Sequence, residues 1–256
     1  MFPYAFGWLD MYAVMIGIGI ISCFVFLEIY YRKQKVRKLL ISYFEILGTL
    51  AIGLGLLFAV LFQNLYDFIE NPETYSWSWS MTFYGGLIGG VVLFLLGYFF
   101  VIRKKFGPQM RNLLTIAPAC ITIAHAFGRI GCFLSGCCYG IETDSPLGVL
   151  FPGHNHAVLP TNLFEAVFLF VLSGTLFFLS LKINFKYNMG VYLVSYGIWR
   201  FIIEFFRDDH RGEFIPGLSP SQFWSIIMIV GGIVFFFIYH FVEKRIVSKK
   251  EAQQEN

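Results

Sequence analysis

The feature of this sequence that most constrains its fold is a set of long apolar runs. They cover residues 11–30, 40–62, 82–102, 114–135, 162–181, 189–206 and 222–242. A helix needs about 20 apolar residues to cross the hydrocarbon core of a bilayer, and backbone groups in lipid must hydrogen-bond within their own segment. The sequence therefore predicts an all-α polytopic membrane protein with seven transmembrane helices.

The composition excludes an ordinary soluble protein. Charged residues make up 14% of the chain and hydrophobic residues 57%, whereas about 25% of the residues in a soluble domain are charged. We expect a single integral membrane domain over residues 1–256 and no nucleic-acid partner. The opening residues, MFPYAFGWLDMYAV, have neither a basic segment nor a small-residue cleavage site, which favours a retained first helix over a signal peptide.

The positions of the lysines and arginines predict the orientation of these helices. Of the 19 basic residues, all but four fall in alternate loops and in the C-terminal tail, at 32–38, 103–111, 182–186 and 244–250. Lysine and arginine collect in cytoplasmic loops. The N-terminus is therefore expected outside and the C-terminus in the cytoplasm.

The basic residues that this rule leaves over are all arginines in or near the outer half of the predicted spans, namely Arg129, Arg200, Arg207 and Arg211. An ionised group at membrane depth costs at least about 2.5 kcal/mol on insertion scales, so it persists where it faces a partner or a polar cavity. The planar guanidinium matches phosphate and carboxylate better than an ammonium does. The pattern predicts an anion site that faces outward.

Three of these arginines share one segment with an acid. In WRFIIEFFRDDHRG the charged positions are spaced by four, three and four residues, which places them on one face of a helix: Arg200, Glu204, Arg207 and Arg211. Glu204 can pair with Arg200 or Arg207, and a self-satisfied ion pair without a ligand is the alternative. Arg129 has no acid within four positions, so a partner helix or a bound anion must supply one.

Several motifs together resemble those of the bacterial prolipoprotein diacylglyceryl transferases. GRIGCFLSGCCYG (128–140) is similar to that family's central GRIGNF motif, and FYGGLIGG (83–90) to its HGGLIGG element. PTNLFEA (160–166), RFIIEFFR (200–207) and LSPSQ (218–222) follow in the same order and spacing. The resemblance runs from about residue 8 to residue 242.

The resemblance implies a reaction at the outer face of the bacterial cytoplasmic membrane. Members transfer a diacylglyceryl group from phosphatidylglycerol to the lipobox cysteine of secreted precursor proteins, and release glycerol phosphate. Arg129 is then the residue that binds the phospholipid, Arg200 lies beside the leaving phosphate, and Glu204 orients the Arg200 guanidinium. Further positions that the resemblance places at the substrates are Tyr12, Cys132, Gly140, Glu165 and Arg207. At Gly140 a side chain would crowd a lipid headgroup, and Glu165 pairs with polar groups of the site or forms a helix-packing hydrogen bond.

The chain departs from the family pattern at several polar positions. Tyr84 stands where many members have histidine, and a phenol with an ordinary pKa near 10 is a poor general base, so Tyr84 can instead bond headgroup oxygens. Cys132 and Ser135 replace asparagines, Cys137 replaces a glutamate, Leu56 replaces an arginine, and Asp10 precedes Tyr12 where arginine is common. A paralogue with another acceptor or donor is the alternative that these departures leave open.

His125 and the cysteines are further candidates for chemistry. His125 lies one helical turn before Arg129, where a buried neutral imidazole can act as a base or serve as a structural donor. Four of the five cysteines fall at 120, 132, 137 and 138 without the CxxC pairing of zinc sites, and a bridge between Cys137 and Cys138 would be strained. We therefore expect small buried side chains and neither a metal nor a cofactor.

A second class of function uses the same arginines. Gly85, Gly86, Gly89 and Gly90 form small-xxx-small pairs that favour close helix packing over a phosphate loop. A transporter or a membrane protein that binds anions or lipids would need a path through the inner half, where only Glu28 and Glu45 are ionisable near the basic loops. The scarcity of such groups favours the enzyme.

Overall fold

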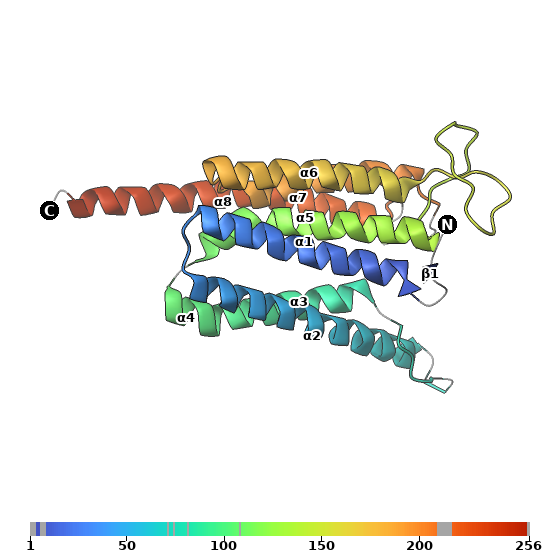
Figure 1. Ribbon diagram of the computed structural model, residues 1–256, viewed down its shortest axis with the longest axis horizontal. Coiled ribbons are helices and arrows are strands. Elements are labelled where there is room, and N and C mark those ends of the chain that lie inside the picture. Colours follow the sequence, from blue (N-terminus) through green and yellow to red (C-terminus); the bar gives the residue numbers. More distant parts are fainter. Residues whose placement is uncertain are drawn as a thin grey trace. The chain divides into compact units, whose positions relative to one another are not determined.

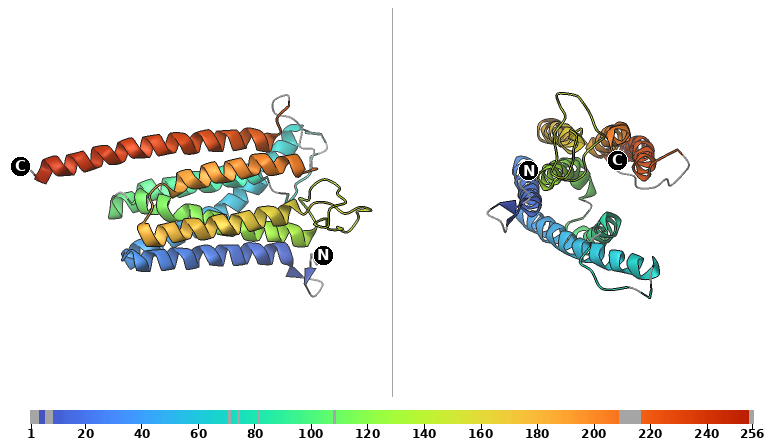
Figure 2. Two further views of the ribbon diagram at one scale, coloured as in Figure 1. Left: turned by 90° about the horizontal axis from the view of Figure 1, so that it is seen from above. Right: turned by 90° about the vertical axis from the view of Figure 1, so that its right-hand side faces the viewer.

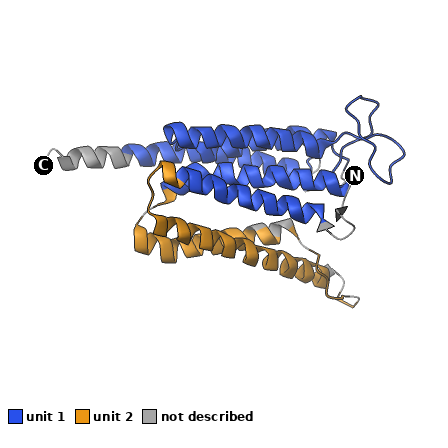
Figure 3. Ribbon diagram, viewed as in Figure 1, with its two compact units in different colours: residues 1–30, 111–256 blue, residues 31–110 orange. Residues whose placement is uncertain are grey.

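The computed structural model describes residues 4–5, 9–70, 72–73, 75–80, 82–107, 109–208 and 217–254. The chain divides into two compact units (Figure 3), one formed by residues 1–30 with 111–256 and the other by residues 31–110. The expectation of one integral domain stays a prediction, and each unit is described by itself. Arg211 lies outside the described residues.

Helices make up nearly all of the regular structure (Figure 1). The larger unit holds most of α1 (Met11–Lys33) together with α5 (Met110–Ser135), α6 (Thr161–Ile183), α7 (Asn188–Ile203), the 3-10 turn η2 (Glu204–Phe206) and α8 (Pro220–Gln254). The smaller unit holds α2 (Lys38–Glu70), α3 (Phe83–Gly97), the π-helical segment η1 (Tyr98–Ile102) and α4 (Arg103–Phe106). Two short antiparallel strands, β1 (Tyr4–Ala5) and β2 (Leu9–Asp10), precede α1.

The all-α membrane fold is confirmed, and six of the seven predicted spans correspond to single helices of spanning length. Among the described residues six helices are long and apolar enough to cross a membrane, and they contain six of the seven predicted runs. The run at 82–102 is instead divided between α3, which has 15 residues, and η1. The backbone there changes to the wider π-helical hydrogen bonding at Tyr98 and continues into α4 without leaving the helical region. The seventh span therefore stays a prediction.

The helices of the larger unit run side by side in both views of Figure 2. Close contacts between them and hydrogen bonds from side chains to backbone carbonyls hold this unit together. A Cβ built on Gly131 of α5 would lie 2.9 Å from Tyr12 Cδ2 on α1, so the missing side chain of Gly131 leaves room for the Tyr12 ring between the two helices. Hydroxyls of α6 donate to carbonyls of α5, as Ser173 does to Ala119 at 3.0 Å and Ser180 to Thr115 at 2.9 Å. Such contacts matter because apolar burial alone does not drive helices together in lipid.

The smaller unit confirms the packing role expected for its glycines. A Cβ on Gly89 of α3 would lie 2.6 Å from Phe58 Cβ on α2, and one on Gly90 would lie 3.2 Å from the carbonyl oxygen of Ala51. The small-residue face of α3 therefore receives α2 directly. The side chain of Tyr84, in the same segment, is not among those that the structure describes.

Candidate functional site

A buried ion pair between α5 and α6 forms the centre of the site. Arg129 Nε lies 3.0 Å from Glu165 Oε2, and the Glu165 side chain is fully buried. Arg129 is six residues before the end of α5 and Glu165 four residues after the first residue of α6, so at a rise of about 1.5 Å per residue the pair lies roughly 6–9 Å inside this end of the helices. Arg129 has no acidic residue nearby in the sequence, and the structure shows that Glu165 of the neighbouring helix α6 supplies its carboxylate.

His125 and Tyr196 complete the surroundings of this pair. Arg129 Nε donates to His125 Nε2 at 3.2 Å, and Tyr196 donates its hydroxyl to Glu165 Oε1 at 2.8 Å. An imidazole nitrogen accepts a hydrogen bond only when it carries no proton, so this contact with Arg129 requires an unprotonated Nε2. Both side chains therefore fix the orientation of Arg129 and Glu165.

Glu204 joins two further arginines. Its Oε2 lies 2.8 Å from Arg200 Nη2 and 3.9 Å from Arg207 Nε. The prediction that all the charged residues from 200 to 211 share one helical face is wrong at Arg207: α7 ends at Ile203, η2 tightens the last turn, and Arg207 is extended and pairs its backbone with Gly140. The carboxylate still reaches both guanidiniums because the 3-10 turn keeps residues three apart on the same side.

A capping box at the start of α8 supports this second cluster. The Ser219 hydroxyl accepts from the backbone N–H of Gln222 at 3.2 Å, and the Gln222 side chain accepts from the backbone N–H of Ser219 at 3.1 Å, with Pro220 at the first helical position. This is the reciprocal arrangement that the pattern S-P-S-Q favours. Ser219 also donates to Glu204 at 2.8 Å, so the helix cap holds the carboxylate in place.

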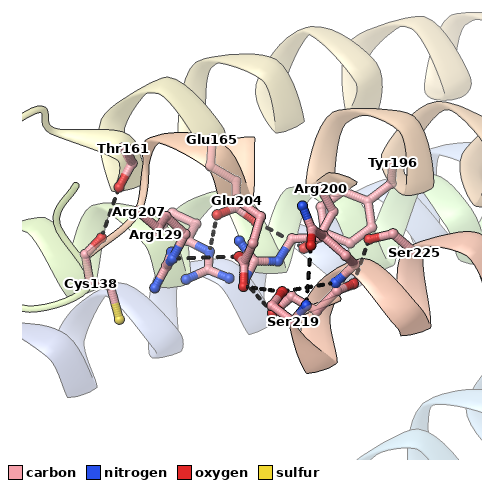
Figure 4. A network of polar contacts seen from close by, with 12 residues as sticks. Arg129, Cys138, Thr161, Glu165, Tyr196, Arg200, Glu204, Arg207, Ser219 and Ser225 are labelled. Carbon is pink, nitrogen blue, oxygen red and sulfur yellow. Dashed lines mark hydrogen bonds and ion pairs between the residues drawn. The ribbon is translucent and has the colours of Figure 1, made fainter. Parts of the chain in front are cut away.

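The dipoles of the helices stabilise the charged side chains of the site. Arg129 and Arg200 lie towards the carboxyl ends of α5 and α7, whereas Glu165 lies near the amino end of α6. Helix dipoles stabilise cations at carboxyl ends and anions at amino ends. Both arginines act electrostatically on Glu165, and Figure 4 shows the two ion pairs as parts of one polar network.

Both arginines keep donors that the described protein does not use. Arg129 donates its Nε hydrogen to His125 and forms an ion pair with Glu165, and among the described residues its two Nη groups make no hydrogen bond. Arg200 uses Nη2 for Glu204 and for Ser221 Oγ at 2.8 Å, while its Nη1 is buried without a hydrogen-bond partner in that part of the chain. Buried donors are nearly always satisfied, so the arrangement can bind an oxyanion such as a phosphate.

The turn after α5 gathers three cysteines. Gly136, at φ 72°, donates its N–H to Phe133 O, and Cys137 donates its N–H to Cys132 O, which is the Schellman pattern of a helix end. The sulfur atoms of Cys132, Cys137 and Cys138 lie within 4.8 Å of one another. Hydrogen bonds from the Cys132 and Cys137 thiols lower the pKa of the Cys138 thiol against the effect of burial, and the charges of Arg207 and Arg129 add to this shift.

Comparison with known proteins identifies the family. The sequence matches the family described as prolipoprotein diacylglyceryl transferase over residues 4–238. The chain belongs to this family. The resemblance seen in the motifs is thus confirmed, and the chain is a membrane-embedded diacylglyceryl transferase.

Relatives from two bacterial genera agree with this assignment. The chain is 32% identical to the phosphatidylglycerol–prolipoprotein diacylglyceryl transferase of Clostridium tetani over 238 residues, which cover 90% of the chain and 93% of the relative. It is 33% identical to a second such protein, numbered 2, from Clostridium perfringens over 88% of the chain and 89% of that relative. The Francisella tularensis subsp. novicida protein of the same description is 34% identical over 73% of the chain and 72% of its own length.

The structure brings together most of the residues that the sequence proposed for the transferase site. Two linked clusters contain Arg129, Glu165, Arg200, Glu204 and Arg207. Tyr12 contacts Gly131 of α5, and Cys132 is buried one turn after Arg129. The part of Tyr84 in the site stays a prediction.

Sequence reasoning missed four polar partners. Tyr196, Ser219, Ser221 and Gln222 were not proposed, and His125 was left open between base and structural donor. A signal was present for Ser219, because S-P-S-Q is a capping-box pattern with proline at the first helical position. No signal in the sequence points to Tyr196, because only the packing of α6 against α7 brings its hydroxyl to Glu165.

Gly140 has a reason within the protein for carrying no side chain. A Cβ on Gly140 would lie 2.2 Å from the carbonyl oxygen of Phe206 and 2.7 Å from Thr161 Cγ2. We expect Gly140→Ala to lower the free energy of unfolding by about 1–3 kcal/mol, as overpacking does. Chemical unfolding in detergent measures this change. Gly174→Ala on α6, where a Cβ meets nothing within 4 Å, is the control, and unchanged stability with lost transfer in Gly140→Ala would instead support the headgroup contact.

Proposed function

We propose that the chain transfers a diacylglyceryl group from phosphatidylglycerol to the cysteine thiol of lipobox-containing precursor proteins. The family match and the description shared by the relatives support this donor and this acceptor class. In the reaction the sulfur forms a bond to the glyceryl carbon that carries the phosphate ester. The carbon–oxygen bond breaks, glycerol phosphate leaves with the electron pair, and the thiol gives up its proton.

The observation that carries the proposal is the pair of arginines with unused donors. The Nη groups of Arg129 and the buried Nη1 of Arg200 are oriented by Glu165, His125, Glu204 and Ser221, not by a ligand. Donors held in advance where charge develops lower the barrier most, because they need no reorganisation during the reaction. We assign Arg129 to the phospholipid phosphate and Arg200 to the leaving phosphate.

The acids act as positioning residues in this scheme. Glu204 contacts Arg200 and Arg207 together, and Glu165 contacts Arg129 from the neighbouring helix. Arg207 adds positive charge at the same end of the site. We propose that Tyr84 contacts headgroup oxygens or the acceptor thiol, and that Tyr12, Cys132 and Gly140 line the lipid.

We place the site towards the outer leaflet of a bacterial cytoplasmic membrane. The alternate basic loops support an external N-terminus and a cytoplasmic C-terminus. Arg129 and Glu165 lie near the end of the helices that carries the loop from 136 to 160. In this orientation, precursors that emerge from the membrane reach the site with their cysteine, and the phospholipid enters sideways from the leaflet.

Packing beneath the arginines favours the enzyme over a transporter. Away from the ion pairs, the buried polar side chains of α6 and α7 bond to protein carbonyls: Ser173 to Ala119, and Asn188 to Thr115 at 2.9 Å and to Leu176 at 3.0 Å. Polar groups that line a water-filled path would face water instead. The donors of these side chains are therefore used within the protein, which supports the enzyme.

Reconstitution of the full chain tests the proposed function. We expect purified protein in vesicles with phosphatidylglycerol to add one diacylglyceryl group to a lipobox peptide, seen as the corresponding mass gain on its cysteine. The control peptide carries serine in place of that cysteine and should gain nothing, because its hydroxyl is a far weaker nucleophile. A chain that binds the lipid but never modifies the cysteine, beside a relative that does, would favour the paralogue with another acceptor.

A further inference from the structure

The thiol cluster formed by Cys132, Cys137 and Cys138 is a second site beside the arginines. The sulfur atoms lie within 4.8 Å of one another, and all three cysteines are free. The expectation of small buried side chains fails for Cys137, which is exposed. Cys23 and Cys120 are apart from this cluster, since Cys23 donates its thiol to the Cys120 carbonyl between α1 and α5.

The conformation of the backbone brings the three thiols of this cluster together. The Schellman turn places the side chains at its two ends against each other, and here these are Cys132 and Cys137. Cys138 follows with φ 60°, a left-handed conformation that costs a side-chain-bearing residue strain and persists only where its surroundings impose it. Two side chains from the start of α6 impose it. Asn162 donates to the Cys137 carbonyl at 2.8 Å, and Thr161 donates to the Cys138 carbonyl at 3.2 Å (Figure 4).

We propose that Cys132, Cys137 and Cys138 bind one soft metal ion of the zinc class. Thiolates lie about 2.3 Å from zinc and thus roughly 3.8 Å from one another in a tetrahedral site. The sulfurs need to close by about 1 Å at most to reach this geometry, which small side-chain rotations supply. Each thiol releases its proton to solvent as it becomes a ligand.

The surroundings suit three thiolates around a divalent ion. Such a centre carries one net negative charge, and Arg207 and Arg129 both act electrostatically on Cys138. Cys137 and Cys138 line a pocket of about 300 Å³ together with Gly136, Tyr139 and Asp208. Three protein ligands leave a fourth position, which water or the Asp208 carboxylate of this pocket would fill.

A metal fits the cluster better than a disulfide does. A disulfide would use two of the three thiols, and a bridge between the adjacent Cys137 and Cys138 would be strained. A metal ion uses all three sulfurs and keeps the turn as the structure has it. The proposal depends on this geometry alone and not on the transfer reaction.

Cobalt binding to the full-length, untagged protein tests the proposal. The protein is purified in detergent, stripped with a chelator, kept reduced and titrated with Co²⁺. We expect one cobalt per chain with a thiolate-to-cobalt charge-transfer band, which Zn²⁺ then displaces. A wild-type protein without this band would overturn the proposal whatever the variants do.

Serine variants assign the ligands. Cys132→Ser, Cys137→Ser and Cys138→Ser should each weaken cobalt binding about 100-fold or more, because loss of a ligand costs at least as much as loss of its supporting contacts. The double variant Cys23→Ser/Cys120→Ser is the matched control and should bind as the wild type does. Equal binding by all variants, or a disulfide among the three cysteines in protein purified without reductant, would overturn the assignment. Lipid and peptide are absent from this assay, so a failed transferase test leaves its outcome unaffected.

Discussion

Replacing Arg129 by lysine is expected to lower the rate of diacylglyceryl transfer by about 100- to 1000-fold, the usual effect of removing a donor that stabilises developing charge. The reason lies in the geometry of the guanidinium. Nε contacts Glu165 and His125, and the two Nη groups remain for phosphate. A lysine ammonium at this position keeps the charge, but it cannot hold the carboxylate and present a planar pair of donors at the same time.

The measurement is the initial rate on phosphatidylglycerol and a lipobox peptide, with kcat and KM determined separately for each substrate. Arg111→Lys is the matched control, because Arg111 is an exposed arginine at the other end of the same helix. It should change the rate by less than about 2-fold, as exposed substitutions away from a site rarely matter. If Arg129→Lys transfers at the wild-type rate, the fork of the guanidinium has no part in catalysis.

Neutralising Glu165 alone is expected to destabilise the protein by about 3–5 kcal/mol, because it leaves a buried charge without its partner. Glu165→Gln keeps the shape of the side chain and an oxygen for the Tyr196 hydroxyl, but the Arg129 guanidinium loses its counter-charge. Chemical unfolding in detergent gives the change in the free energy of unfolding. Glu142→Gln, at an exposed carboxylate of the loop after α5, is the isosteric control and should have little effect.

A second substitution separates the charge effect from a packing effect. Adding Arg129→Met to Glu165→Gln removes both charges, so most of the lost stability should return while transfer stays abolished. The coupling free energy between the two substitutions then measures the interaction of Arg129 with Glu165. Additive losses would mean that the two side chains contribute separately and that Glu165 does not hold Arg129.

Local patterns in the sequence predicted much of the fold. Six apolar runs coincide with helices of spanning length, since the requirement for about 20 apolar residues depends on the bilayer and not on neighbours. The glycines of α3 were predicted to receive a helix and do so, because small-residue spacing is itself a packing surface. The run at 82–102 is helical as well, but it contains a π-helical segment that no pattern in the sequence indicated.

Local patterns in the sequence predicted only part of the candidate transferase site. Glu204 between Arg200 and Arg207 follows from spacing along one segment, although the chain leaves the helix before Arg207. The capping box at Ser219 was readable in the motif S-P-S-Q, but its contact to Glu204 was not, since the two residues meet only after α7 and α8 pack.

The cysteines show where local reasoning stops. Spacing argued against a metal site because the sequence has no CxxC pair. In the structure a Schellman turn brings Cys132 and Cys137 together, and Asn162 and Thr161 of α6 hold Cys138 beside them. Side chains separated by more than 20 residues along the chain therefore decide how three neighbouring sulfurs are arranged.

The sequence by itself determined the membrane class, the family and the presence of arginines at a depth where each needs a partner. Those properties depend on composition, periodicity and the cost of a charge in lipid, which act residue by residue. Only the tertiary structure decided that Glu165 forms an ion pair with Arg129 and that Tyr196 and His125 orient this pair. It also decided which guanidinium N–H groups make no hydrogen bond within the described protein. Hydrogen bonds and ion pairs between helices depend on distances of about 3 Å, and such distances are set by how whole helices pack.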